Sequence, residues 1–176
     1  MYQSGYENTP DATTMGCMST PIQKIPVRRI TGEDTNLGEY SGKVLLVVNV
    51  ASKCGLTKQY EALEKLYRDY RDRGLVVVGF PANDFKAQEP GTNEEIKTFC
   101  SSKYNVTFPM YAKVSVKGAD ITPLYKFLTE TKGGDVKWNF TKFLADKHGN
   151  VIARFEPNVT PDSPELVSAV EAALKK

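Results

Sequence analysis

Two short, almost entirely apolar runs constrain the fold of this chain more than any other feature. They span residues 44–50 and 75–80, and residues 59–73 between them carry apolar side chains at helical spacing, ending at Gly74. Apolar residues at successive positions over this length are typical of buried strands. We therefore predict a strand–helix–strand unit whose two strands are parallel neighbours joined by a right-handed crossover.

The segments around this unit predict further helices and an antiparallel hairpin. Capping residues mark three helix starts, and a turn at 147–150 between two apolar stretches marks the hairpin. In chain order the further elements are a strand at 25–30, turns at 32–42, helices from Thr92 to about Tyr104, from Thr122 and from Ser163, and strands at 140–144 and 151–155. The order βαβ, helix, ββα is the plan of the thioredoxin-like fold with an inserted helical segment. The predicted class is α/β, a central mixed β-sheet flanked by helices.

Composition bounds the domain organisation and the compartment. The chain has 176 residues, 40% hydrophobic and 25% charged, which suits one globular domain, predicted at 21–176. Residues 1–20 are polar and aperiodic, and we interpret them as a disordered leader or partly a cloning remnant. No apolar stretch is long enough to span a bilayer and no signal-peptide pattern opens the chain, so we expect a cytoplasmic protein without stable membrane insertion. The net charge of +2 does not indicate a nucleic-acid partner.

Cys54 gives the strongest functional signal in the chain. It lies where the strand at 44–50 ends and connects to the helix at 59–73. The positive end of the helix dipole and the neighbouring Lys53 both favour a thiolate there, and the thiolate is the nucleophilic form. A buried structural cysteine is the alternative interpretation. The polar flank at 52–55 favours the reactive one.

Other kinds of site have little support in the sequence. The three cysteines, Cys17, Cys54 and Cys100, are too widely and irregularly spaced for a disulfide framework or a zinc site. We interpret Cys17 as an incidental thiol. His148 is the one histidine and lies in the predicted hairpin turn, so we assign it no role. We therefore expect neither a metal nor a bound cofactor.

A lone thiolate at the start of such a helix suits a limited set of reactions. It could exchange disulfides, conjugate a thiol or reduce a peroxide, but dithiol exchange needs Cys-x-x-Cys and Thr57 occupies the second position. Peroxide reduction needs one thiolate and nearby hydrogen-bond donors. Gln88, Trp138 and Asn139 flank strand ends expected at the same rim of the sheet as Cys54. The alternative for them is a core tryptophan and two surface amides.

Three motifs resemble those of the glutathione peroxidase family. Residues 49–57 are similar to its active-site signature, 80–91 to its second motif and 138–144 to its third, in that order along the chain. The resemblance implies a thioredoxin-like fold and a catalytic tetrad. In that tetrad the peroxidatic residue is Cys54, and the other three positions are Gln88, Trp138 and Asn139. It also implies thioredoxin or glutathione as reducing co-substrate.

The chain departs from the family pattern at its second cysteine. Residues 82–84 read Ala-Asn-Asp where members often have Cys-Asn-Gln. Thioredoxin-dependent members carry a resolving cysteine in the region of Cys100, which stands here one place earlier than in many of them. We interpret Cys100 as resolving. The alternative is a packed core cysteine, because the stripe of Ile96, Phe99 and Cys100 forms a buried helix face. If Cys100 resolves, the helix must open to bring the two sulfurs together.

The short segment at 130–136 bears on assembly and substrate. Tetrameric members of the family have a long loop there, so the resemblance suggests a monomer with an open site that admits lipid hydroperoxides as well as hydrogen peroxide. The predicted function is a thiol peroxidase acting through a Cys54 sulfenic acid, regenerated by thioredoxin or by glutathione. Two alternatives remain: a peroxide-sensing thiol relay to a partner protein, and a non-catalytic thioredoxin-like binding module.

Overall fold

A computed structural model describes residues 21–176 and contains a four-stranded mixed sheet in the order β4-β3-β5-β6. The strands of this sheet are β3 (Val44–Val50), β4 (Leu75–Pro81), β5 (Lys142–Ala145) and β6 (Val151–Phe155). β3 pairs in parallel with β4, β3 pairs antiparallel with β5, and β5 pairs antiparallel with β6. This arrangement confirms the predicted thioredoxin-like α/β fold. Residues 1–20, with the predicted leader and Cys17, lie outside the described residues.

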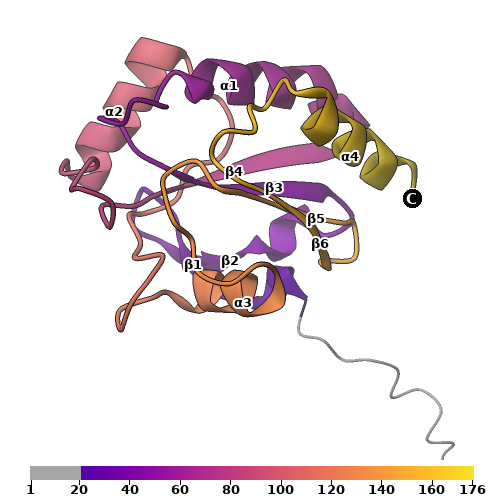
Figure 1. Ribbon diagram of the computed structural model, residues 1–176, viewed down its shortest axis with the longest axis horizontal. Coiled ribbons are helices and arrows are strands. Elements are labelled where there is room, and N and C mark those ends of the chain that lie inside the picture. Colours follow the sequence, from indigo (N-terminus) through magenta and orange to yellow (C-terminus); the bar gives the residue numbers. More distant parts are fainter. Residues whose placement is uncertain (1–20) are drawn as a thin grey trace, which may run out of the picture.

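Helices cover both faces of the sheet, as Figure 1 shows. α1, α2 and α4 lie on one face, and α3 lies on the other together with the small ribbon of β1 and β2. The helices are α1 (Gln59–Tyr70), α2 (Asn93–Tyr104), α3 (Pro123–Thr131) and α4 (Pro164–Lys175), with short 3-10 turns η2 (Ile22–Lys24), η3 (Leu37–Tyr40) and η4 (Arg71–Arg73). Within residues 21–176, none of these helices combines the length and the apolar character needed to cross a membrane.

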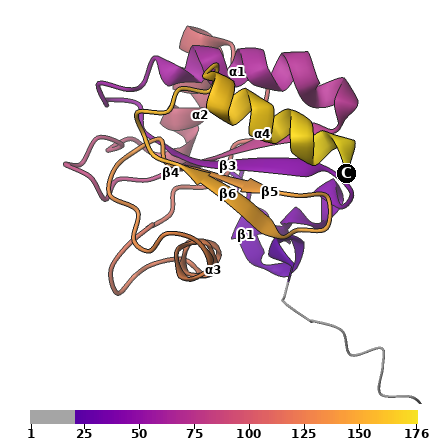
Figure 2. The ribbon, with the colours of Figure 1, turned by 45° about the vertical axis from the view of Figure 1, so that its right-hand side comes forward.

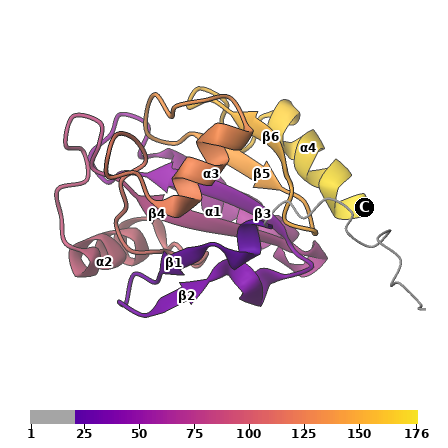
Figure 3. The ribbon, with the colours of Figure 1, turned by 90° about the horizontal axis from the view of Figure 1, so that it is seen from below.

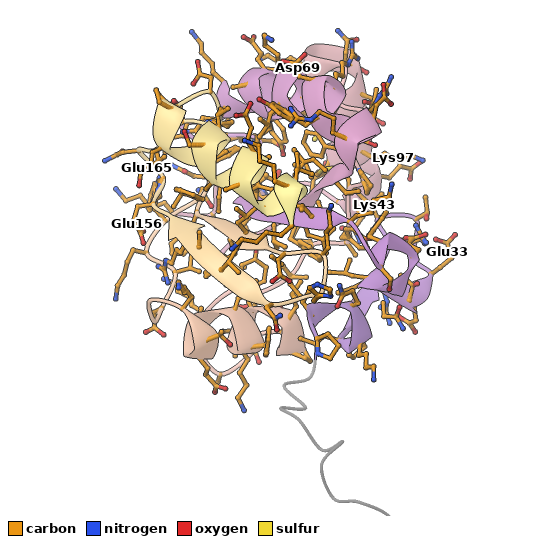
Figure 4. The ribbon with its side chains drawn as sticks, turned by 90° about the vertical axis from the view of Figure 1, so that its right-hand side faces the viewer. Glu33, Lys43, Asp69, Lys97, Glu156 and Glu165 are labelled. Carbon is orange, nitrogen blue, oxygen red and sulfur yellow. The ribbon has the colours of Figure 1, made fainter. Side chains whose placement is uncertain are left out.

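Alternation along the strands divides the core into two layers. Val44, Leu46 and Val48 of β3 point to the α1, α2 and α4 face, whereas Leu45 and Val47 point to the α3 face. Because both faces are covered, every residue of β3 and β4 is buried, which explains their continuous apolar sequences. Figure 2 shows α4 beside α1 above this sheet. Charged side chains such as Lys43 and Glu165 project from the outside of the molecule in Figure 4.

The sequence-based boundaries were wrong in three places. The strand expected at 25–30 is shorter and spans only Pro26–Arg28. The turns expected at 32–42 include β2 (Asp34–Asn36), which pairs antiparallel with β1 (Pro26–Arg28). β2 was missed because its residues are polar and the ribbon is only half-buried. The strand expected from residue 140 begins at Lys142, because Phe140 adopts a positive φ of 66° and turns the chain before pairing starts. The capping box at Thr92 and the stop at Gly74, with φ of 109°, are confirmed.

Candidate active site

Cys54 lies in a tight loop between the end of β3 and the start of α1, as predicted. The loop is closed by Thr57, whose hydroxyl accepts the Cys54 N–H at 2.9 Å and donates to the Ala51 carbonyl at 2.9 Å. The Cys54 sulfur accepts the backbone N–H of Leu56 at 3.4 Å. The thiol is half-buried and free. A backbone donor aimed at a partly accessible sulfur is an arrangement that stabilises negative charge on it.

Gln88 and Asn139 meet directly at the same edge of the sheet. Gln88 lies in the segment that follows β4, and Asn139 lies just before β5. Asn139 Nδ2 donates to Gln88 Oε1 at 3.0 Å, and the Gln88 carbonyl accepts the N–H of Lys53 at 3.0 Å. Lys53 precedes Cys54, so this backbone bond fixes the cysteine loop against the carboxamide pair. Asn139 is fully buried, and its Oδ1 has no hydrogen-bond partner among residues 21–176.

Asn49 positions the segment that carries Trp138 and Asn139. Its Nδ2 donates to the Trp138 carbonyl at 3.1 Å, and its Oδ1 accepts the N–H of Thr141 at 3.1 Å. The Asn49 carbonyl also accepts the N–H of Phe140 at 2.7 Å. The sequence analysis gave this residue no role. A polar residue inside the apolar run 44–50 was the signal that could have found it, since a buried amide must be hydrogen-bonded.

Trp138 forms the half-buried rim of this region. Its ring packs against Phe85, with centroids 5.6 Å apart, and the Lys86 ammonium lies 5.8 Å from the indole centroid. No hydrogen bond within residues 21–176 uses its indole N–H, and none joins the Cys54 sulfur to Gln88, Trp138 or Asn139. The four residues are therefore gathered at one edge through their loops, with a direct side-chain bond only between the two carboxamides.

Cys100 lies on the buried face of α2, with 1% of its surface exposed. It belongs to the same core cluster as Ile96 and Tyr60, and Cys54 packs against the edge of that cluster. Burial raises the pKa of the Cys100 thiol to about 11. The thiol is therefore protonated and enclosed in this conformation.

A pocket of about 400 Å³ separates the Cys54 loop from α2. The residues that line it include Ser52, Lys53, Glu89, Gly91, Ile96 and Phe99. Two buried polar atoms at this pocket, Ser52 Oγ and Glu89 Oε2, have no hydrogen-bond partner within residues 21–176. The sequence analysis assigned nothing to either residue. No group of three or more His, Cys, Asp or Glu side chains suited to a metal ion occurs in the described part of the chain.

Comparison with known proteins identifies the family of the chain. The family model described as glutathione peroxidase matches residues 22–129, more than half of the chain. The chain belongs to the glutathione peroxidase family. The resemblance of its motifs is thereby confirmed at the level of the family. The tetrad roles carried over from that resemblance remain predictions.

Individual relatives match most of the chain. Thioredoxin/glutathione peroxidase BtuE of Escherichia coli is 43% identical over 183 residues, covering 90% of this chain and 100% of its own length. Hydroperoxy fatty acid reductase gpx1 of Synechocystis is 46% identical over 155 residues, covering 82% and 90%. The crystal structure of Trgpx in apo form has a TM-score of 0.75 at 36% identity, covering 90% of this chain and 97% of that one. This glutathione peroxidase chain therefore spans nearly the full length of each.

Proposed function

We propose that this protein reduces hydroperoxides through Cys54, with Gln88, Trp138 and Asn139 as its hydrogen-bonding partners. One observation carries the proposal: the Lys53–Gln88 backbone bond and the Gln88–Asn139 side-chain bond connect the cysteine loop to two carboxamides. Membership of the glutathione peroxidase family makes the chain a peroxidase. In the proposed reaction the Cys54 thiolate attacks one peroxide oxygen, the O–O bond breaks, and an alcohol or water leaves a sulfenic acid on the sulfur.

The carboxamides of Gln88 and Asn139 and the indole of Trp138 stabilise negative charge during the attack on the peroxide. Negative charge moves from the sulfur to the departing oxygen, and preorganised N–H donors at the edge of the sheet stabilise it in both places. Gln88 and Asn139 each carry two amide protons, and their mutual bond uses one of these. The other protons and the Trp138 indole N–H are available to the reacting atoms.

We propose fatty-acid and phospholipid hydroperoxides as substrates beside hydrogen peroxide. The Synechocystis relative is named for hydroperoxy fatty acids. The short 130–136 segment and the half-buried Trp138 support an open rim that a bulky acyl chain can approach. We also propose that the protein is a monomer and that it is cytoplasmic.

For the reductant we propose thioredoxin, acting on a Cys54–Cys100 disulfide. The E. coli relative is named for both thioredoxin and glutathione, and a second thiol in the same core cluster supports the disulfide route. Because Cys100 lies on the buried face of α2, this route includes opening of that helix. Direct attack of glutathione on the sulfenic acid is the competing branch.

Two serine variants test the proposal. Cys54→Ser is expected to abolish peroxide consumption with either reductant. Cys100→Ser is expected to keep one equivalent of Cys54 oxidation, trapped as a sulfenic acid adduct in mass spectrometry, and to lose thioredoxin-supported turnover. Full thioredoxin turnover by Cys100→Ser would remove Cys100 from the cycle. Persistent peroxide consumption by Cys54→Ser would refute the proposed nucleophile.

A further inference from the structure

Glu89 is a buried carboxyl group that the proposed reaction does not yet use. It is 1% exposed, follows Gln88 directly, and its backbone N–H is held by Asn83 Oδ1 at 2.9 Å. Its Oε2 has no well-formed hydrogen bond in the described part of the chain, although the Ser52 hydroxyl and N–H lie close enough to stabilise the carboxylate. A buried acceptor without a well-formed hydrogen bond is costly, so its retention at this place calls for a chemical explanation.

The surroundings of Glu89 connect the two cysteine-bearing elements. Its carboxyl lines the pocket whose other walls are Ser52, two residues before Cys54, and Ile96 and Phe99 of α2. Ile96 lies one helical turn before Cys100 on the same buried face. The pocket lies between α2, which carries Cys100, and the loop that carries Cys54, and the charge of the Glu89 carboxyl that lines it acts on the Cys100 thiol.

Cys100 is a poor nucleophile in its resting form. Burial raises the pKa of its thiol to about 11, so at neutral pH the thiolate is a minor species. We propose, on the basis of the function proposed above, that Glu89 accepts the Cys100 proton as this thiol attacks the Cys54 sulfenic acid. Glu89 is then the general base of the resolving step and assists the departure of the hydroxyl group.

The step balances in atoms and electrons. The Cys100 proton passes to the Glu89 carboxylate, and the thiolate sulfur forms a bond to the Cys54 sulfur while the S–O bond of the sulfenic acid breaks. The departing hydroxide takes the proton from Glu89 and leaves as water. The Cys100 sulfur is oxidised, the Cys54 sulfur is reduced, and Glu89 returns to its starting state.

The charges around Glu89 set the pH dependence of this step. Burial raises the pKa of Glu89 above its usual value, and the Ser52 hydroxyl and amide and the Lys113 ammonium oppose that effect. Lys53 and Glu95 face the same pocket, and Tyr60 lies with Cys100 behind it. A raised pKa brings a carboxyl group closer to the working pH of a general base. Disulfide formation should therefore rise with pH through the Glu89 titration and then level off.

Single-turnover mixing of the reduced full chain with one equivalent of hydrogen peroxide tests the inference. Acid-quenched samples are analysed by mass spectrometry for Cys54 sulfenic acid and for the Cys54–Cys100 disulfide at several pH values from 5 to 9. Glu89→Gln keeps the shape of the side chain and removes the base. We expect it to slow conversion of sulfenic acid to disulfide about 100-fold at pH 7. Without the base, the rate should rise tenfold per pH unit with no plateau below pH 9, because only the thiol then titrates.

Controls separate this role from a structural one and from the underlying function. Glu165→Gln removes an exposed carboxylate from α4, outside this pocket, and should leave the rate and its pH profile unchanged. Hydrogen exchange of α2 amides should be the same in Glu89→Gln and in the unmodified chain. The assignment would be overturned if Glu89→Gln and the unmodified chain formed the disulfide at equal rates with the same pH profile. It would also be overturned if the slower step in Glu89→Gln were accompanied by altered hydrogen exchange of α2. Absence of any disulfide in the unmodified chain would instead refute the resolving role of Cys100, and with it this inference.

Discussion

Asn139 Nδ2 donates to Gln88 Oε1 at 3.0 Å, joining two loops whose bonded residues are 51 positions apart in the sequence. Each side chain orients the other, so the pair presents its remaining amide protons as a unit. The bond uses one amide proton of Asn139 and the side-chain carbonyl of Gln88, and leaves the other amide proton of Asn139 and both amide protons of Gln88 outside it.

Replacing either carboxamide should slow oxidation of Cys54. We expect Gln88→Ala and Asn139→Ala each to lower the second-order rate constant with hydrogen peroxide about 100-fold, the effect of losing one preorganised donor. The double variant should lose little more, because the residues act as a pair. Stopped-flow fluorescence of Trp138, the one tryptophan of the chain, measures the step. Asn158→Ala, an exposed asparagine, is the control. Additive losses would show that the carboxamides act independently.

Asn49 should contribute to both stability and rate. Asn49→Ala leaves the Trp138 carbonyl and the Thr141 N–H without their side-chain partner, and we expect a loss of about 3 kcal/mol in the free energy of unfolding. The rate of Cys54 oxidation per folded molecule should also fall, because the 138–141 segment loses its anchor. Urea denaturation and stopped-flow mixing measure the two effects. Val48→Ala in the same strand should reduce stability alone, and an equal loss of rate in that control would contradict the positioning role.

The capping box of α2 should control how fast the disulfide forms. Thr92 accepts the Glu95 N–H at 3.2 Å, and Glu95 accepts the Thr92 N–H in return. Thr92→Ala should weaken the helix by about 1 kcal/mol. If opening of α2 precedes attack by Cys100, disulfide formation should then be roughly fivefold faster. Ser163→Ala weakens the cap of α4 and should have no such effect. A slower or unchanged step in Thr92→Ala would indicate that α2 does not open during the cycle.

Sequence patterns predicted the scaffold better than the chemistry around the cysteine. The strands at 44–50 and 75–80 were predictable because burial on both faces selects an apolar residue at every position. Asp34–Asn36 escaped notice because a half-buried ribbon imposes no apolar alternation. Glu89 and Ser52 were missed for a different reason: their significance depends on a pocket formed by segments far apart in the chain. Periodicity within one segment carries no information about such a pocket.

Lys142 should make the stability of the protein depend on pH above neutrality. Its buried ammonium donates to the carbonyls of Pro157 at 3.2 Å and Val159 at 2.6 Å, and burial lowers its pKa from 10.5 to about 8. Between these two values the unfolded chain binds the proton and the folded chain does not. The contribution of Lys142 to the free energy of unfolding therefore increases as pH rises from about 8 to 10.5. The increase is at most roughly 3 kcal/mol.

Comparison of the unmodified chain with Lys142→Met isolates this contribution. Both proteins contain the same tyrosines, including those such as Tyr111 whose pKa is raised in the folded chain, so the effect of these groups cancels in the difference. Urea denaturation at pH 7, 8, 9 and 10 measures the free energy of unfolding of both proteins. The value for the unmodified chain should increase relative to that of Lys142→Met at each step. Lys43→Met, which removes an exposed lysine labelled in Figure 4, controls for the loss of one positive charge. A difference that stays constant or shrinks with pH would mean that the folded chain does not disfavour the Lys142 ammonium.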